Sequence, residues 1–310
     1  MRIVYFGSPG AAIPSLERLL QAGHSIELVI TQPDKPAGRG KAPTPPPVKE
    51  AARRHGIPVL QPEKIRKDPE VLAALGKIAP DIIVVVAYGQ IIPSTIINLP
   101  QHKSVNVHFS LLPKYRGAAP VQWAILSGEE KTGVTIFELN EKMDEGDILS
   151  QLETDIGPRE NARELEERLS RLGADLLVKI LEEIDELPHL PQDQARATLA
   201  PRLHKDQGRI DWGKDAISID RMVRAFSTWP GAFTFFRGQR IIIHAGSPLT
   251  GLALPAEPGR VVEARKEGLV IGCGSGNAYL IERLQRENRK EMAAAEFLRG
   301  MKIETGDLLG

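Results

Sequence analysis

The sequence has a single cysteine, no long apolar run and no net charge. The one cysteine among its 310 residues, Cys273, excludes an intramolecular disulfide and a cysteine-based metal cage. No apolar run approaches the roughly 18 residues that a membrane span needs, and no charged-then-apolar leader precedes Ile3–Phe6. The 40 basic and 40 acidic side chains balance, so bulk charge does not indicate a nucleic-acid partner. We expect a cytoplasmic protein.

The chain is long enough for two domains, and its first half alternates between two kinds of pattern. Short apolar runs are followed by stretches with helical spacing. Residues 81–87 are mostly β-branched and apolar on both faces, which is typical of a strand buried in a parallel sheet. The alternation predicts an α/β fold with a Rossmann-like, doubly wound, mostly parallel sheet. We expect this catalytic domain to cover residues 1–188.

The pattern changes near residue 188. Residues 189–207 are rich in proline, glutamine and alanine and show weak periodicity, which predicts a linker. Beyond them, short strand-like runs are separated by glycine-containing turns. This arrangement predicts a smaller, OB-like β-barrel domain over residues 208–310.

Two polar residues, Asn106 and His108, end a predicted strand. Their two-residue spacing places them on the same face of that strand. Open α/β sheets bind ligands at the carboxyl ends of their parallel strands. An amide and an imidazole offer an oxyanion donor and a proton carrier. Taken alone, however, the pair is better explained as the polar end of a strand that caps a loop.

The segment Met143–Leu149 places two aspartates around Gly146. By composition it is a turn, although such a turn can also bring a carboxylate to a histidine. Its spacing does not match a calcium loop. The Gly7–Gly10 turn lacks the G-x-G-x-x-G pattern, and the chain has no phosphate-binding P-loop, so no nucleotide site is predicted.

In combination, four segments resemble the folate-dependent formyltransferase family: Asn106-x-His108, Ser110–Pro113, Arg116–Pro120 and Asp144-x-Gly146-Asp147. Further blocks resemble the branch of that family that formylates methionyl-tRNA, namely Thr31–Lys41, Arg209–Trp212 and Trp229–Ala232. The resemblance covers essentially the whole chain. Two residues depart from the family pattern: Phe109 stands in place of a small residue or proline, and Gly10 in place of a polar or acidic residue.

The resemblance implies transfer of the formyl group of 10-formyltetrahydrofolate to the α-amino group of methionine on initiator methionyl-tRNA, without a metal. Asn106 and protonated His108 would stabilise the tetrahedral oxyanion, and Asp144 would hold and charge the imidazole. His108, Asp144 or an ordered water would take the amine proton. The residues implied for the folate site are Ser110, Leu111, Leu112 and Pro113.

Residues 35–54 hold six basic residues against one acid. As a charge run this is a solvated loop, but the resemblance implies contact with the tRNA acceptor stem through Arg39 and Lys41. Residues 208–310 carry 15 basic and 12 acidic residues, against 25 and 28 in residues 1–207. This asymmetry is compatible with RNA contact by the second domain but does not establish it. We expect a monomer.

Two other functions stay open. One is a formyltransferase or hydrolase that uses the same folate with a small acceptor, such as a sugar nucleotide, a ribotide or water. The other is a non-catalytic RNA-binding protein built on an inactive transferase fold. The basic loop and the second domain argue against the ribotide, and the intact Asn106, His108 and Asp144 argue against the inactive fold.

Overall fold

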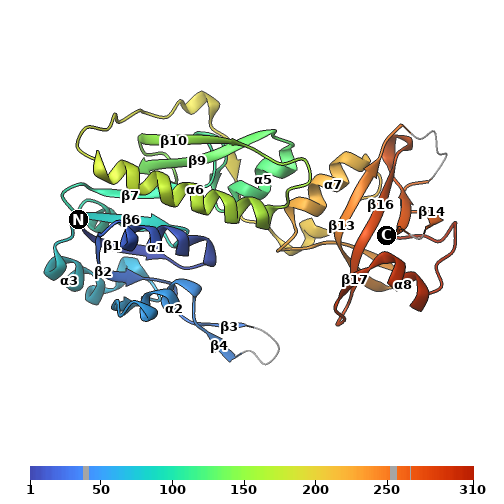
Figure 1. The fold of residues 1–310 in the computed structure, drawn as a ribbon, viewed down its shortest axis with the longest axis horizontal. Coiled ribbons are helices and arrows are strands. Elements are labelled where there is room, and N and C mark those ends of the chain that lie inside the picture. The colour runs from blue at the N-terminus through green and yellow to red at the C-terminus, as the bar shows by residue number, and fades with distance from the viewer. Residues whose placement is uncertain (38–41, 252–256, 266) are drawn as a thin grey trace. The chain divides into compact units, whose positions relative to one another are not determined.

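The computed structural model describes residues 1–37, 42–251, 257–265 and 267–310. The chain forms two compact units, which Figure 1 colours along the sequence. Unit 1 comprises Met1–Pro120, Lys131–Asp155 and Glu166–Pro201, and unit 2 comprises Val121–Glu130, Ile156–Leu165 and Arg202–Gly310. The chain therefore passes between the units several times, the last time after Pro201. The predicted domain bounds, 1–188 and 208–310, stay a prediction.

Unit 1 contains a seven-stranded sheet in the order β10-β9-β7-β6-β1-β2-β5. The five strands β5, β2, β1, β6 and β7, which are neighbours in that order, are parallel. Strand β9 runs antiparallel to both β7 and β10. The chain order reverses between β1 and β6, which confirms the doubly wound topology predicted from the sequence. The strands are β1 (Arg2–Gly7), β2 (Ser25–Ile30), β5 (Val59–Leu60), β6 (Ile82–Val86), β7 (Ser104–His108), β9 (Lys131–Glu138) and β10 (Ile148–Asp155).

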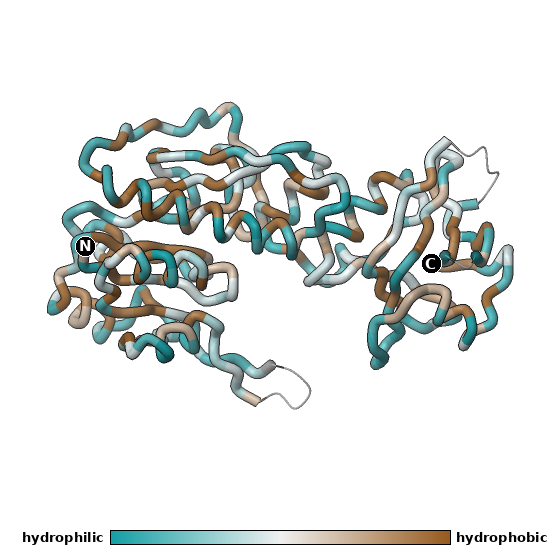
Figure 2. Tube along the Cα trace, viewed as in Figure 1, coloured by the Kyte–Doolittle hydropathy of each residue, from teal (hydrophilic) through white to brown (hydrophobic). Residues whose placement is uncertain are grey.

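Apolar side chains fill both faces of this sheet. Val4 and Phe6 of β1 belong to one buried cluster, whereas the intervening Tyr5 is fully buried and outside that cluster. The central strands are correspondingly brown along most of their length in Figure 2, as expected for strands covered on both sides. The helices are α1 (Ile13–Gln21), α2 (Pro47–Arg54), α3 (Pro69–Ile78), α4 (Ser94–Ile97) and α6 (Ala162–Glu182), the last reaching into unit 2.

Helix α6 approaches β7 and β9 closely because Gly173 has no side chain. A Cβ there would stand 2.8 Å from Cγ1 of Val107 and 3.1 Å from Cγ1 of Val134. The helix runs from Ala162 to Glu182. None of the helices in the described part of the chain has the length and apolar character to cross a membrane.

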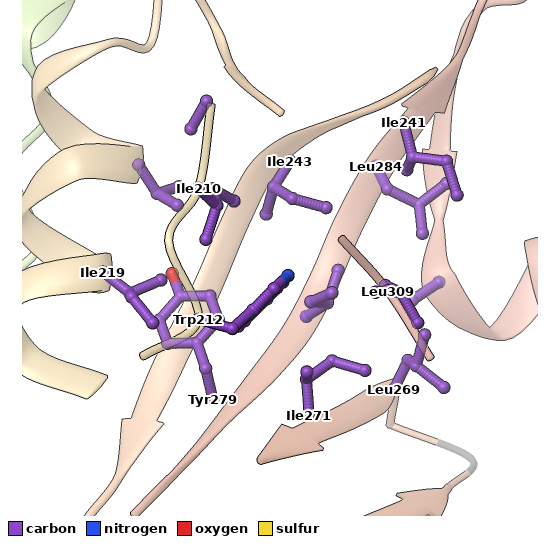
Figure 3. Packing of buried hydrophobic residues seen from close by; sticks show 14 of the residues in the cluster. Ile210, Trp212, Ile219, Ile241, Ile243, Leu269, Ile271, Tyr279, Leu284 and Leu309 are labelled. Carbon is purple, nitrogen blue, oxygen red and sulfur yellow. The ribbon is translucent and has the colours of Figure 1, made fainter. Parts of the chain in front are cut away.

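Unit 2 contains an antiparallel sheet in the order β12-β13-β16-β15-β14, with β17 paired to β16. Strands β12 and β14 lie at the two ends of this order, and among the described residues no pairing between them closes the sheet into a barrel. Buried side chains, among them Trp212 and Tyr279, form its core (Figure 3). Its elements are α5 (Pro120–Ser127), α7 (Ala216–Ala225), β12 (Ala232–Phe236), β13 (Gln239–Leu249), β14 (Val261–Ala264), β15 (Leu269–Gly272), β16 (Ala278–Arg286), β17 (Glu291–Ala293) and α8 (Ala294–Gly300).

The reactivity of the single cysteine tests whether this core is packed as described. Cys273 is 1% exposed, and burial raises the pKa of its thiol to about 12. Since the thiolate is the reactive form, only about one thiol in 10,000 would be ionised at pH 8. We expect the folded protein to react with a disulfide reagent such as DTNB at least ~100-fold more slowly than the protein unfolded in guanidinium chloride. Stoichiometric labelling of the folded protein within minutes would contradict this burial.

The segment predicted as a linker, residues 189–207, is attached to unit 1 as far as Ala200. Strand β11 (Leu199–Ala200) pairs in parallel with β8 (Arg116–Gly117), and Leu190 forms a bridge with Ile148. The side chain of Gln192 is buried. Hydrogen bonds rather than an apolar face hold this segment, so hydrophobic periodicity does not reveal it.

Candidate active site

The carboxyl end of β7 presents Asn106 and His108 on one face of the sheet. The intervening Val107 points the other way, since its Cγ1 lies beside Gly173 of α6. His108 is 6% exposed, and Asn106 is partly buried. Alternation along the strand therefore brings the amide and the imidazole together, as the two-residue spacing predicted.

Phe109, one of the two residues that depart from the family pattern, lies away from this face. Its side chain is 7% exposed. A Cβ at Gly173 would stand 3.7 Å from its Cε1, so the ring lies beside α6. The larger side chain is accommodated in the core behind β7, on the opposite side of the strand from His108.

The imidazole of His108 has different neighbours at its two nitrogens. Its Nε2 lies 2.9 Å from the carbonyl oxygen of Tyr115. A carbonyl oxygen accepts and never donates, so Nε2 carries the hydrogen of this bond. The other nitrogen, Nδ1, lies 3.9 Å from Oδ2 of Asp144, which is too long for a direct hydrogen bond. Nδ1 is therefore the nitrogen available to a reacting group or a bridging water.

Asp144 lies in the turn between β9 and β10, and its main chain is held in an unusual conformation. Its φ is +54°, in the left-handed region that few residues other than glycine adopt. Its Oδ2 accepts a hydrogen bond of 2.8 Å from the main-chain N–H of Gly117. Two residues later, Gly146 lies so close to β9 that a Cβ would stand 1.6 Å from the carbonyl oxygen of Glu138. The turn therefore fixes the carboxylate beside His108.

Asn106 contributes an amide group that is not fully used within the protein. Its Oδ1 is buried and has no hydrogen-bond partner among the described residues. A buried polar atom without a partner costs free energy, and such atoms occur at functional sites. The oxygen of this amide is thus available to accept a hydrogen bond from a bound substrate. In the described part of the chain, no three His, Cys, Asp or Glu side chains converge so that they could hold a metal ion.

The segment Ser110–Pro113 forms a tight turn that is bound to β9 and β10. Thr135 donates to the carbonyl oxygen of Ser110 at 2.7 Å and accepts from the N–H of Leu112 at 3.0 Å. Gln151 donates to the carbonyl oxygen of Leu112 at 2.8 Å. The side chains of Ser110 and Leu112 are buried, whereas Leu111 and Pro113 are partly exposed. Of the four predicted folate residues, the latter two therefore offer side-chain surface to a ligand.

Arg116 and Gln192, for which no role was predicted, belong to a hydrogen-bond network beside the Asp144 turn. The guanidinium of Arg116 is buried and donates from Nε and Nη2 to Oε1 of Gln192, at 3.0 and 2.7 Å. Its Nη1 lies 3.6 Å from Oε1 of Glu145. The only sequence signal for Gln192 was a polar residue in a segment without periodicity, which is too weak to identify a site residue.

The predicted tRNA contacts, Arg39 and Lys41, lie outside the described residues. The structure does describe the hairpin that leads to them, β3 (Lys35–Ala37) and β4 (Ala42–Thr44). Before β3, the carboxylate of Asp34 accepts from Nζ of Lys49 at 2.7 and 2.8 Å and from Nε2 of Gln61 at 2.7 Å. These hydrogen bonds, first that from Lys49, hold the pKa of the Asp34 carboxyl below its usual value. The base of the hairpin is therefore anchored to α2.

Comparison with known proteins identifies relatives over both units. A family model described as formyl transferase matches residues 1–181, and one described as formyl transferase, C-terminal domain, matches residues 202–302. The chain is 46% identical over 310 residues to the methionyl-tRNA formyltransferase of Syntrophus aciditrophicus, covering 99% of this chain and 98% of that one. It is 43% identical over 312 residues to the enzyme of the same name from Geobacter metallireducens, covering 100% and 99%.

Solved structures with the same fold are more distant in sequence. WlaRD, a sugar 3N-formyl transferase crystallised with dTDP and 5-N-formyl-THF, superposes with a TM-score of 0.66 at 20% identity, over 94% of this chain and 99% of that one. HypX from Aquifex aeolicus, in complex with tetrahydrofolic acid, gives a TM-score of 0.66 at 19% identity, over 100% of this chain and 50% of that one.

Proposed function

The chain belongs to the methionyl-tRNA formyltransferase family, and from this premise we propose that it transfers the formyl group of 10-formyltetrahydrofolate to the α-amino group of methionine on initiator methionyl-tRNA. The observation that carries the proposal is the convergence of Asn106, His108 and Asp144 at the carboxyl edge of the sheet in a chain related to that family over its whole length.

In the proposed reaction, the neutral amine attacks the formyl carbon. A new C–N bond forms, a tetrahedral oxyanion develops, and the bond from carbon to N10 of the folate then breaks. The side-chain N–H of Asn106 and the Nδ1–H of protonated His108 donate to the oxyanion and stabilise it. The carboxylate of Asp144 stabilises the imidazolium. The amine loses one proton and N10 gains one, so a group that takes up the first can return the second.

The space between His108 and Asp144 supports this arrangement. The 3.9 Å between Nδ1 and Oδ2 leaves both atoms able to bind a third group. The Nε2–H bond to Tyr115 fixes the ring, so Nδ1 points toward that group. We assign the folate site to the Ser110–Pro113 turn, with Leu111 and Pro113 offering apolar surface to a flat ring.

We assign tRNA recognition to Arg39 and Lys41, which lie in the sequence between β3 and β4, and to residues 208–310. The ion pair between Asp34 and Lys49 supports the first assignment, because it holds the chain that enters β3 in a defined place on α2. The excess of 15 basic over 12 acidic residues in 208–310 supports the second. We further propose that the protein acts as a cytoplasmic monomer.

One assay tests the function. The purified protein is incubated with 10-formyltetrahydrofolate and charged initiator tRNA, and formyl-methionine is followed over time. We expect formylation of tRNA-bound methionine and none of free methionine. Turnover of the folate without tRNA would instead indicate a small acceptor or water. Binding of tRNA without any turnover would indicate a non-catalytic protein.

Replacing Arg39 with alanine is expected to raise the KM for methionyl-tRNA about tenfold, because one desolvated contact to phosphate is worth roughly 1–2 kcal/mol. The KM for the folate should change less than about twofold. Steady-state kinetics with each substrate varied in turn measure both values. The matched control is Arg171→Ala, an exposed arginine on α6 that should leave both constants unchanged. A higher folate KM with normal tRNA kinetics would remove Arg39 from the RNA site.

A further inference from the structure

We propose that Gln192 is a positioning residue for formyl transfer. It sets the main chain of the turn that carries Asp144, and thereby the place of the carboxylate beside His108. The proposal rests on the function proposed above. Gln192 contributes no group to the reaction itself and acts through two carbonyl groups of the turn.

The side-chain amide of Gln192 is fully used in one hydrogen-bond network. Its Nε2 donates to the carbonyl oxygens of Asp144 and Gly146, both at 2.8 Å. Its Oε1 accepts from Nε and Nη2 of Arg116. A primary amide has two N–H donors and one oxygen with two lone pairs, so all four positions are occupied. The side chain is 7% exposed, so water does not readily replace these bonds.

The hydrogen-bond partners of the Gln192 side chain determine the orientation of its amide group. A guanidinium only donates and a carbonyl oxygen only accepts. The oxygen of Gln192 must therefore face Arg116, and its nitrogen must face the turn. No other side chain of the same shape provides this combination, since glutamate has two acceptors and no donor when ionised.

The turn depends on this support because Asp144 adopts a left-handed conformation with a φ of +54°. Its carboxylate is held by the N–H of Gly117, the residue that follows Arg116. The Arg116–Gly117 segment thus binds the carboxylate directly and binds the main chain of the turn through Gln192. A displacement of about 1 Å at a catalytic group lowers a rate on the order of 100-fold, so loss of this brace affects chemistry more than binding.

The test compares two substitutions of Gln192 with a control on the same segment. In Gln192→Glu, the shape and the acceptor for Arg116 remain, but the two donors become an acceptor that faces two carbonyl oxygens. In Gln192→Ala, the brace is removed. We expect kcat for formyl transfer to fall about 30- to 100-fold in both, with each KM within about threefold. Gln194→Ala is the control, because Gln194 accepts from Nη1 of Arg116 at 2.8 Å and donates to the main-chain oxygen of Gln192 at 3.4 Å, whereas no hydrogen bond joins its side chain to the described residues of the Asp144 turn. We expect its kcat within about twofold of the parent.

A double-substitution cycle separates positioning from a purely structural role. If Gln192 acts through Asp144, then Gln192→Ala should lower kcat by less than about threefold when Asp144→Asn is already present. Single-turnover kinetics, with the folded fraction of each variant measured by thermal unfolding, provide the comparison. An equal loss in both backgrounds overturns the proposal, as does a normal kcat per folded molecule. Lack of formyl transfer to methionyl-tRNA by the parent protein would overturn the proposed function instead.

Discussion

Replacing Asp144 with asparagine is expected to lower kcat for formyl transfer by about 10²- to 10⁴-fold, the range that a positioned proton-transfer group contributes. The substituted side chain still has an oxygen that can accept from the N–H of Gly117, so the turn should keep its conformation. What is lost is the negative charge near Nδ1 of His108. Stopped-flow or quench kinetics at saturating folate and methionyl-tRNA measure the effect, and both KM values should stay within about threefold.

The matched control for Asp144→Asn is Glu145→Gln in the same turn. The carboxylate of Glu145 faces Arg116 and Lys142 instead of His108. The Glu145→Gln variant therefore loses one negative charge one residue away from Asp144, from a carboxylate that does not face the imidazole. We expect its kcat within about threefold of the parent. Comparable rates for both variants, close to the parent, would exclude Asp144 from the reaction.

Replacing Gly146 with alanine is expected to abolish most of the activity and to destabilise unit 1. The added Cβ would stand 1.6 Å from the carbonyl oxygen of Glu138, so the turn must move by more than an ångström. Forcing extra atoms into a filled site costs about 1–3 kcal/mol, and displacing Asp144 by this much lowers the rate at least ~100-fold. Thermal unfolding and steady-state kinetics on the same sample measure the two effects.

The control for Gly146→Ala is the same change at Gly76, in the last turn of α3. A Cβ at Gly76 would meet nothing within 4 Å. Alanine is the better helix former, so this variant should be more stable by about 0.5–1 kcal/mol and should keep its activity. A Gly146→Ala protein with parental stability and rate would show that the turn has a second arrangement of equal free energy.

Strands and helices with a clear hydrophobic pattern were predictable from the sequence, because the pattern shows which faces of the element are buried. The β-branched run Ile82–Val86 has no polar face, and a strand of that kind is stable only between two layers. Helix α6 has an apolar stripe long enough to fix its direction. The two-residue spacing of Asn106 and His108 likewise follows from strand geometry.

The helices α3 and α7 were not among the elements predicted from the sequence, although their ends carried a signal. Helix α3 begins after Asp68, whose carboxylate accepts from the N–H groups of Glu70 and Val71, and Pro69 occupies its first position. Helix α7 begins after Asp215, whose carboxylate accepts from the N–H of Ser218. Capping residues identify short helices better than periodicity does, because two or three turns contain too few apolar residues to establish a stripe.

The sequence by itself determined the alternation of strands and helices in the first domain, the face on which Asn106 and His108 lie, and, through its resemblance to a known family, the reaction. Local spacing and periodicity decide such properties within one element. Tertiary structure alone decided how these segments are held: the N–H of Gly117 binds the Asp144 carboxylate beside His108, and Gln192 supports that turn from a segment that resembled a linker. Hydrogen bonds between polar groups distant in sequence make these contacts, and they leave no periodic signal because each depends on a single donor and acceptor brought together by the folded sheet.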